Sequence, residues 1–262
     1  MIETIYIARH GFRMNWVNSN WKSVTGLPRD PPLAAFGETQ AQELADYFLS
    51  LPEDQRPTAI FSSPYYRCLQ TAHPTAVALS LPLYVEHGLS EWYSPVTPGT
   101  GLHPRPSSAA SLEQYFSSID SSWSSIYYPP RKGEDVEEVL KRARDFLDLF
   151  VPAVPEKHKR VLLVSHAATT IALARALLKN PEMPLRVGCC SLTEVVRSSE
   201  SSGWEAKRLA DGAHLKEGAA REWGFEHIEI ANGQVVPDPG VPGTEDEVDD
   251  LVGAQVALAS NL

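Results

Sequence analysis

Two short apolar runs, each followed at once by a histidine, constrain the fold of this chain most. The first run, Ile5–Ala8, leads through Arg9 to His10, and the second, Val161–Val164, leads through Ser165 to His166. Continuous runs of β-branched and apolar residues are typical of central parallel strands, which are buried on both faces. We therefore expect residues 3–9 and 160–165 to be strands of one sheet.

Further apolar runs alternate with segments of helical periodicity. Strands are expected at residues 58–63, 83–86, 190–196 and 204–209, and helices at residues 37–51, 65–79, 134–150 and 168–178. Strands that alternate with helices favour an α/β fold. We predict a three-layer α/β/α sandwich with a mostly parallel central sheet.

Two stretches depart from this alternation. Residues 92–132 are rich in Pro, Ser and aromatic residues and are expected to form an excursion over the functional site, partly helical around Leu112–Ser118. Residues 234–262 are acidic and lack aromatic residues, a composition typical of disorder. The sequence thus predicts a domain at residues 1–233 and a disordered acidic tail at residues 234–262.

Charge and composition exclude several classes of protein. The net charge is −10, and residues 234–262 hold six acidic residues and no Lys or Arg, which leaves −4 for residues 1–233. Neither part offers a basic stripe, so direct binding to nucleic acid is not expected. No apolar stretch approaches the ~18 residues of a membrane span, and the first strand begins too near Met1 for a signal peptide. Of three cysteines, Cys189 and Cys190 are adjacent, which favours a reducing compartment. The expected location is intracellular, in the nucleus or the cytoplasm.

The polar residues after three of the strands are the candidate functional residues. His10, His166 and the segment Ser62–Arg67 each follow a strand, and loops at the carboxyl ends of parallel strands converge on one pocket. Gly11 is expected to allow a sharp turn there. A helix that begins after His166 offers free N–H groups to an anion. Together with Arg9, Arg13 and Arg67, the two imidazoles are suited to a phosphate dianion.

This arrangement suggests phosphoryl transfer. We expect neutral His10 to attack phosphorus as a covalent nucleophile, while His166 and the arginines stabilise charge on the phosphoryl oxygens. Glu91, just after the fourth strand, is the candidate proton donor.

Plainer roles remain open for several of these residues. Arg67 could be a salt-bridge partner at a helix start, Arg13 could lie outside the pocket, and Glu91 could be a solvated loop carboxylate. Glu134 is interpreted as a carboxylate that suits the start of a helix. Cys68 is interpreted as a packing residue. No cofactor and no metal site are predicted, because arginines repel cations and no paired His/Asp spacing is present.

Taken together, these motifs resemble those of the histidine phosphatase superfamily, which has the phosphoglycerate-mutase-like fold. The resemblance covers roughly residues 3–233. It implies that His10 in Arg9-His10-Gly11 is the phosphorylated residue, Arg67 the second arginine, His166 the second histidine and Glu91 the acid. Metabolic mutases of the family usually have an acidic residue where this chain has Phe12. Arg13 instead resembles the additional arginine of acid phosphatases and of ubiquitin-associated, SH3-containing phosphatases.

Within the superfamily, the sequences around His10, Arg67 and Glu91 look closest to a fungal group that includes the tau subunit of RNA polymerase III transcription factor IIIC. Three functions follow from these resemblances and from the residues. The first is a metal-independent phosphomonoesterase that acts through phosphohistidine, on phosphotyrosine or another aryl phosphate. The second is a scaffolding subunit that binds other transcription factor IIIC subunits, with incidental phosphatase activity. The third is a phosphatase of small molecules, such as sugar or glycerate phosphates.

Overall fold

The computed structural model describes residues 1–199, 203–231, 234–236 and 251–256. Its centre is a six-stranded sheet with the strand order β3-β2-β5-β1-β6-β7. The strands are β1 (Thr4–Arg9), β2 (Ala59–Ser62), β3 (Leu83–Val85), β5 (Arg160–Ser165), β6 (Leu192–Arg197) and β7 (Trp204–Asp211). The first four in spatial order are parallel, whereas β6 and β7 are antiparallel to their neighbours. The predicted, mostly parallel sheet is confirmed.

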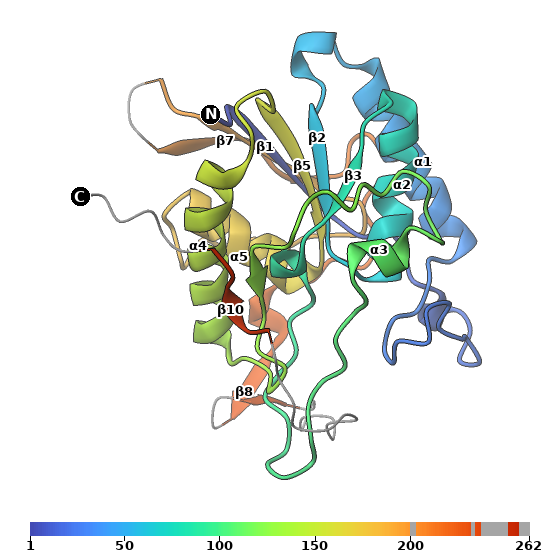
Figure 1. The fold of residues 1–262 in the computed structure, drawn as a ribbon, viewed down its shortest axis with the longest axis vertical. Coiled ribbons are helices and arrows are strands. Elements are labelled where there is room, and N and C mark those ends of the chain that lie inside the picture. The colour runs from blue at the N-terminus through green and yellow to red at the C-terminus, as the bar shows by residue number, and fades with distance from the viewer. Residues whose placement is uncertain (200–202, 232–233, 237–250, 257–262) are drawn as a thin grey trace.

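Two helices cover each face of this sheet (Figure 1). Helices α1 (Ala35–Ser50) and α2 (Tyr66–Leu79) pack on one face, and α4 (Val136–Ala153) and α5 (Ala167–Leu177) pack on the other. Alternate residues of each central strand supply the two cores, as Ile5 and Ile7 do on the α4 side and Tyr6 and Ala8 on the α1 side. The three-layer sandwich predicted from the sequence is therefore correct.

Side-chain caps explain where two helices begin. The expected helix at residues 134–150 begins at Val136, because Asp135 accepts from the Glu138 amide while the Glu138 side chain accepts from the Asp135 amide, both at 2.8 Å. The helix expected at Leu112–Ser118 is instead α3 (Ala109–Leu112). Its start is capped by Ser108, whose hydroxyl accepts from the Ser111 amide, so the prediction was wrong about its position.

The remaining elements are short. They are β4 (Tyr127–Tyr128), β8 (Glu229–Ala231), β9 (Gln234–Val236), β10 (Gly253–Ala254) and the 3-10 turns Met14–Trp16, Glu53–Gln55, His87–Leu89 and Phe225–His227. Among the described residues, no helix is both long enough and apolar enough to cross a membrane.

The prediction of a disordered tail at residues 234–262 is wrong for two segments. Gln234–Val236 pairs with Glu229–Ala231, and Gly253–Ala254 pairs with Tyr127–Tyr128 of the excursion. Backbone pairing orders these residues, with the Gln255 amide also donating to the Ile126 carbonyl oxygen at 2.9 Å. Residues 237–250 and 257–262 of the predicted tail lie outside the described residues.

Candidate active site

The carboxyl ends of three central strands bring the candidate residues together, as the sequence predicted. The pairing of Arg9 with Ser165, and of Ser62 with Val164, places these ends side by side. They border a cavity of about 300 Å³. Its lining residues are Arg9, His10, Arg13, Arg29, Arg67, Glu91, Trp92, Tyr93, Ala167, Ala168 and Trp223.

His10 is buried and held in one tautomer. Its Nδ1 lies 2.8 Å from the carbonyl oxygen of Gly11, and since a carbonyl only accepts, Nδ1 carries the proton and donates. Nε2 therefore keeps a lone pair. Burial, and next the charges of Arg67 and Arg9, lower the pKa of His10 well below its ordinary value. At neutral pH the ring is a neutral base with a free nitrogen, the form that a nucleophile needs.

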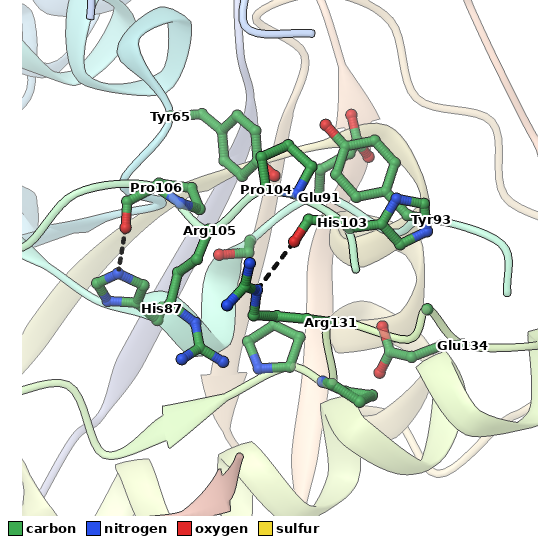
Figure 2. Close-up of a pocket in the computed structure, with 14 residues that line it drawn as sticks. Tyr65, His87, Glu91, Tyr93, His103, Pro104, Arg105, Pro106, Arg131 and Glu134 are labelled. Carbon is green, nitrogen blue, oxygen red and sulfur yellow. Dashed lines mark hydrogen bonds between the residues drawn. The ribbon is translucent and has the colours of Figure 1, made fainter. Parts of the chain in front are cut away.

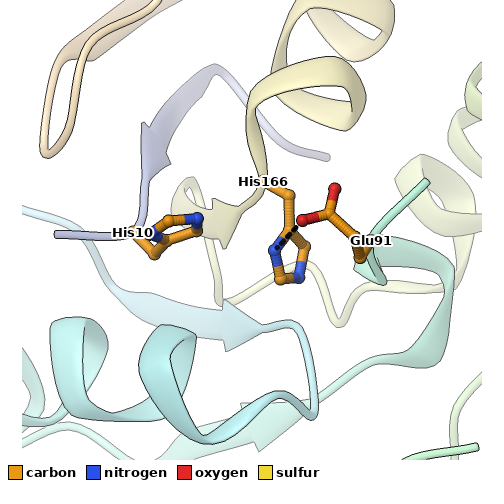
Figure 3. Close-up of side chains that lie close together, drawn as sticks. All are labelled: His10, Glu91 and His166. Carbon is orange, nitrogen blue, oxygen red and sulfur yellow. Dashed lines mark ion pairs between the residues drawn. The ribbon is translucent and has the colours of Figure 1, made fainter. Parts of the chain in front are cut away.

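His166 lies beside His10, with the ring centroids 5.4 Å apart, and its side chain points toward Glu91 (Figure 3). Its Nδ1 is 3.2 Å from Glu91 Oε2 and its Nε2 is 2.8 Å from the Ser63 hydroxyl. Arg67 Nη2, which can only donate, also lies 3.1 Å from Nδ1, so in the neutral ring Nδ1 accepts from Arg67 and Nε2 carries the proton and donates to the Ser63 hydroxyl. Burial lowers the pKa of His166 to about 4 despite the adjacent Glu91 carboxylate.

Arg67 is buried between two carboxylates. Its Nη1 donates to Asp30 Oδ1 at 2.8 Å, and its Nη2 donates to Glu91 Oε2 at 3.1 Å. Burial alone would lower the pKa of Arg67, but Asp30 and Glu91 outweigh it and raise that pKa. Asp30 also accepts from the Tyr66 amide at the start of α2, which fixes the direction of the guanidinium. The prediction that Arg67 is a salt-bridge partner is confirmed, and Arg67 also lines the cavity. Its role as a phosphate ligand stays a prediction.

Glu91 carries the only carboxylate among the residues that line the cavity. Burial would raise its pKa, but the neighbouring His166, Arg67 and Arg13 outweigh burial and lower the pKa below its ordinary value. Glu91 is therefore ionised at neutral pH. Its carboxylate contacts Arg67 and His166, so the interpretation of Glu91 as a solvated loop carboxylate is wrong.

Three further arginines line the cavity. Arg9 Nη1 donates to the carbonyl oxygens of Val187 and Arg221 at 2.9 and 2.5 Å. Arg13 lies over the Trp16 ring at 4.3 Å, and burial together with Arg67 lowers the pKa of Arg13 to about 10. The alternative interpretation, that Arg13 lies outside the pocket, is wrong, because Arg13 lines the cavity. Arg29, which the sequence did not single out, lies 5.3 Å from the Tyr93 ring. Four guanidinium groups outnumber the carboxylates of Glu91 and Asp30, and this excess of positive charge suits the cavity to an anion.

The sequence predicted that Gly11 allows a sharp turn, but the structure gives a different reason for a glycine at this position. It does not have a positive φ, so no left-handed turn explains it. A Cβ on Gly11 would instead lie 2.7 Å from the Gly37 carbonyl oxygen, and a Cβ on Gly37 would lie 2.2 Å from that of Phe12. The two glycines allow the start of α1 to approach the loop that carries His10.

The excursion contributes to the site and to the core. Trp92 and Tyr93 line the main cavity, whereas Trp123 packs against Phe61 and Phe150 of the core. A smaller cavity of about 40 Å³ shares Glu91 and Tyr93 with the main one and is also lined by excursion residues such as His103 and Arg131 (Figure 2). Some aromatic residues of the excursion therefore line the cavity, whereas others pack on the core.

Two residues interpreted as structural do make structural contacts. Glu134 is buried and pairs with Arg142 Nε at 2.8 Å. Cys68 is buried with Sγ 3.5 Å from His166 Nε2, and burial raises the pKa of its thiol, so the reactive thiolate is disfavoured.

The site also meets the simplest requirement for a metal. One ligand atom from each of His10, Glu91 and His166 lies within 4.8 Å of the other two. However, Arg67 Nη2 lies 3.1 Å from both Glu91 Oε2 and His166 Nδ1, so a guanidinium already neutralises this carboxylate. The donor set favours an anion over a cation.

Comparison with known proteins decides the family. Residues 5–212 match the family model of the histidine phosphatase superfamily, branch 1. The chain belongs to this superfamily. The family recognised from the sequence motifs is therefore confirmed.

Two curated relatives of this histidine phosphatase chain carry names that bear on function. It is 41% identical over 216 residues to the transcription factor tau 55 kDa subunit of Saccharomyces cerevisiae, covering 76% of this chain and 49% of that protein. It is 26% identical over 188 residues to the human ubiquitin-associated and SH3 domain-containing protein A, covering 70% of this chain and 27% of that protein. The chain thus spans half or less of the length of either relative.

Solved structures share the fold of the superfamily. The ecdysone phosphate phosphatase of Bombix mori, in complex with tungstate, matches with a TM-score of 0.62 at 19% identity, covering 79% of this chain and 93% of that one. A mycobacterial glucosyl-3-phosphoglycerate phosphatase in complex with VO3 matches with a TM-score of 0.52 at 22% identity, covering 79% and 98%. At these identities the likeness concerns the fold.

Proposed function

We propose that this protein is a metal-independent phosphomonoesterase that works through a phosphohistidine at His10. The observation that carries the proposal is a neutral imidazole, with its Nε2 unprotonated, in a cavity lined by four arginines. Membership of the histidine phosphatase superfamily supports it. Arg9, Arg13, Arg67 and His166 are the proposed phosphate ligands, and Arg29 is added to them from its place in the lining.

The reaction has two steps. In the first, His10 Nε2 attacks phosphorus, an N–P bond forms, and the P–O bond to the leaving group breaks while Glu91 supplies the proton that the leaving oxygen takes up. In the second, a water attacks the phosphohistidine, the N–P bond breaks, and inorganic phosphate leaves with both protons of that water while His10 is neutral again. The arginines and His166 stabilise the charge on the non-bridging oxygens in both steps.

Glu91 can serve as the donor only if it is protonated after substrate binds. In the free protein the nearby positive charges keep it ionised. A phosphate dianion neutralises those same charges, so the pKa of Glu91 rises when substrate binds. Binding of the substrate therefore favours the protonated form of Glu91, which is the form that can donate a proton.

The walls of the cavity favour an aromatic substrate. Trp92, Tyr93 and Trp223 line it together with the arginines. Flat aromatic groups pack well against such side chains, which supports phosphotyrosine or another aryl phosphate as the substrate. A sugar or glycerate phosphate is the alternative, in line with the named substrate of the mycobacterial relative in fold.

The first prediction concerns activity without metal. We expect the purified protein to release phosphate from phenyl phosphate and from phosphotyrosine peptides equally well with and without EDTA. A panel of aryl, sugar and glycerate phosphates, assayed for free phosphate, measures the preference. Activity that disappears with EDTA and returns with a divalent cation would overturn the metal-independent mechanism. A rate on glycerate phosphates orders of magnitude above that on phosphotyrosine would overturn the aryl preference.

A second candidate function rests on the 41% identity to the tau 55 kDa subunit. We propose that the chain also assembles with other subunits of transcription factor IIIC, which would place it in the nucleus. The acidic residues of 234–262 are the proposed contact.

This assembly is tested by affinity capture from nuclear extract of the source organism. We expect the full chain and its His10→Ala variant to recover transcription factor IIIC subunits equally, and a chain that ends at residue 233 to recover less. Recovery of none by the full chain would contradict the assembly. Equal recovery by the shortened chain would remove residues 234–262 from the contact.

A further inference from the structure

We propose that Arg142 is a positioning residue for Glu91 and acts by holding the backbone on both sides of it. The proposal rests on the proposed role of Glu91 as the proton donor. Glu91 lies in a loop after the 3-10 turn His87–Leu89, and no regular element fixes its backbone. Yet a proton donor must be placed to within a fraction of an ångström, because a misplacement of ~1 Å can cost ~10²-fold in rate.

Arg142 reaches this loop from α4. Its side chain is only 2% exposed and lies on the helix face that packs on the core. Its Nη1 donates to the carbonyl oxygens of Gly88 and Ser90, at 3.0 and 3.2 Å. These two carbonyls precede Glu91 by three residues and by one. A single buried guanidinium therefore fixes the chain leading into the proposed donor.

Two buried hydroxyl groups complete this attachment. Ser165 Oγ donates to the Leu89 carbonyl oxygen at 2.6 Å, and Thr169 Oγ1 donates to that of Ser90 at 2.8 Å. All three carbonyls from Gly88 to Ser90 thus accept from side chains of β5, α4 or α5. Since Ser165 and Thr169 flank His166, the same framework holds the proposed donor and the second histidine.

Glu134, the ion-pair partner of Arg142, holds the chain after Glu91. Its carboxylate accepts from Arg142 Nε at 2.8 Å. Its carbonyl oxygen accepts from Trp92 Nε1 at 2.8 Å, and its amide donates to the Tyr93 carbonyl oxygen at 2.8 Å. Figure 2 shows Glu91, Tyr93 and Glu134 around the same small cavity. The Glu134–Arg142 pair therefore ties together the residues on either side of Glu91.

A gain in folding stability is a weak explanation for the buried Glu134–Arg142 ion pair. Burying two charges costs free energy that their attraction only partly recovers, and apolar residues often fill such a space at lower cost. An apolar pair, however, would supply no donors to the carbonyls of Gly88 and Ser90. The specific result of the buried charges is the fixed path of residues 88–93.

The test compares leaving groups in matched variants. Arg142→Lys keeps the charge but cannot donate to Glu134, Gly88 and Ser90 in the same geometry. The double variant Arg142→Met with Glu134→Gln leaves no unpaired buried charge, should the first variant fold poorly. Arg144→Met is the control, because Arg144 is exposed on the same helix. Circular dichroism and a thermal melt establish that each variant is folded at the assay temperature.

We expect the Arg142 variants to lower kcat on phenyl phosphate by roughly ten- to a hundred-fold, and on para-nitrophenyl phosphate by less than about threefold. KM should stay within about threefold for both, and the Arg144 control should match the wild-type protein. Phenolate is the poorer leaving group, so only its departure needs a well-placed proton. Equal losses on both substrates would overturn the positioning role.

A double-variant cycle separates this proposal from the proposed function. In the Glu91→Gln background, Arg142→Lys should cost little more, because the donor that it positions is already gone. A further loss as large as in the wild-type background would overturn the proposal. If the wild-type protein hydrolyses neither substrate, the proposed function itself fails. If Glu91→Gln slows the hydrolysis of phenyl phosphate more than that of para-nitrophenyl phosphate, and Arg142→Lys slows both equally, only the positioning role fails.

Discussion

Replacing His10 with alanine is expected to lower phosphate release from both phenyl phosphate and para-nitrophenyl phosphate by roughly 10⁴-fold or more. The loss should not depend on the leaving group, because both steps of the proposed reaction pass through the N–P bond at Nε2. Alanine removes the one lone pair that burial and the arginines keep free at neutral pH. The cavity and its four arginines stay in place, so phosphate should still bind.

His73→Ala is the matched control, since His73 lies on α2 and lines neither cavity. Steady-state rates are measured beside a trapping experiment, in which the reaction is quenched in alkali and analysed for phosphohistidine by mass spectrometry. The wild-type protein and the control should carry the phosphoryl group on His10, and His10→Ala should carry none. Retention of more than a few per cent of the wild-type rate by His10→Ala would contradict covalent catalysis at this residue.

The convergence of Arg9, His10, Arg67 and His166 could be predicted because each residue ends a central strand or comes soon after one. Parallel strands in one sheet present their carboxyl ends at the same edge, so position along the chain determines position in space. The pairing of Arg9 with Ser165 in the structure meets that expectation. The α/β sandwich with a mostly parallel sheet followed from the alternation of apolar runs and amphipathic segments.

Asp30 and Arg29 could not be found in this way. They lie in the irregular segment between residues 17 and 34, where no periodicity relates sequence to direction. Their contacts with Arg67 and the Tyr93 ring depend on how this segment folds over α2. The pairing of Gly253–Ala254 with Tyr127–Tyr128 is similar, since it joins short segments that are distant in sequence.

The sequence did contain a signal that Arg142 is buried and requires a partner. It lies on the same helical face as Val139, Ala143 and Phe146, at the 3–4 spacing of the buried face of α4. A charged residue in such an apolar face is rarely buried without a partner, which calls for a search for one. Glu134 was interpreted as a carboxylate suited to a helix start, and only the structure shows that it is that partner.

Replacing Glu91 with glutamine is expected to slow the hydrolysis of phenyl phosphate by about 10²-fold or more, and that of para-nitrophenyl phosphate far less. Glutamine keeps an oxygen that can accept from Arg67 Nη2, so the change removes the proton more than the contact. A donor works in its protonated form, so wild-type kcat on phenyl phosphate should fall as pH rises through the pKa of Glu91 in the complex. That fall should be absent in Glu91→Gln.

The pH at which kcat falls shows whether bound phosphate has raised the pKa of Glu91. In the free protein His166, Arg67 and Arg13 overcome burial and hold the pKa of Glu91 below its ordinary value, so without substrate it is ionised throughout the neutral range. A fall of kcat near neutral pH therefore requires bound phosphate to have raised this pKa, as proposed. Glu113→Gln, an exposed carboxylate of the excursion, is the control and should leave the pH profile unchanged. If Glu91→Gln slows both substrates equally and keeps the wild-type profile, Glu91 orients Arg67 and His166 without donating a proton, and the donor must be sought among the other residues around the two cavities.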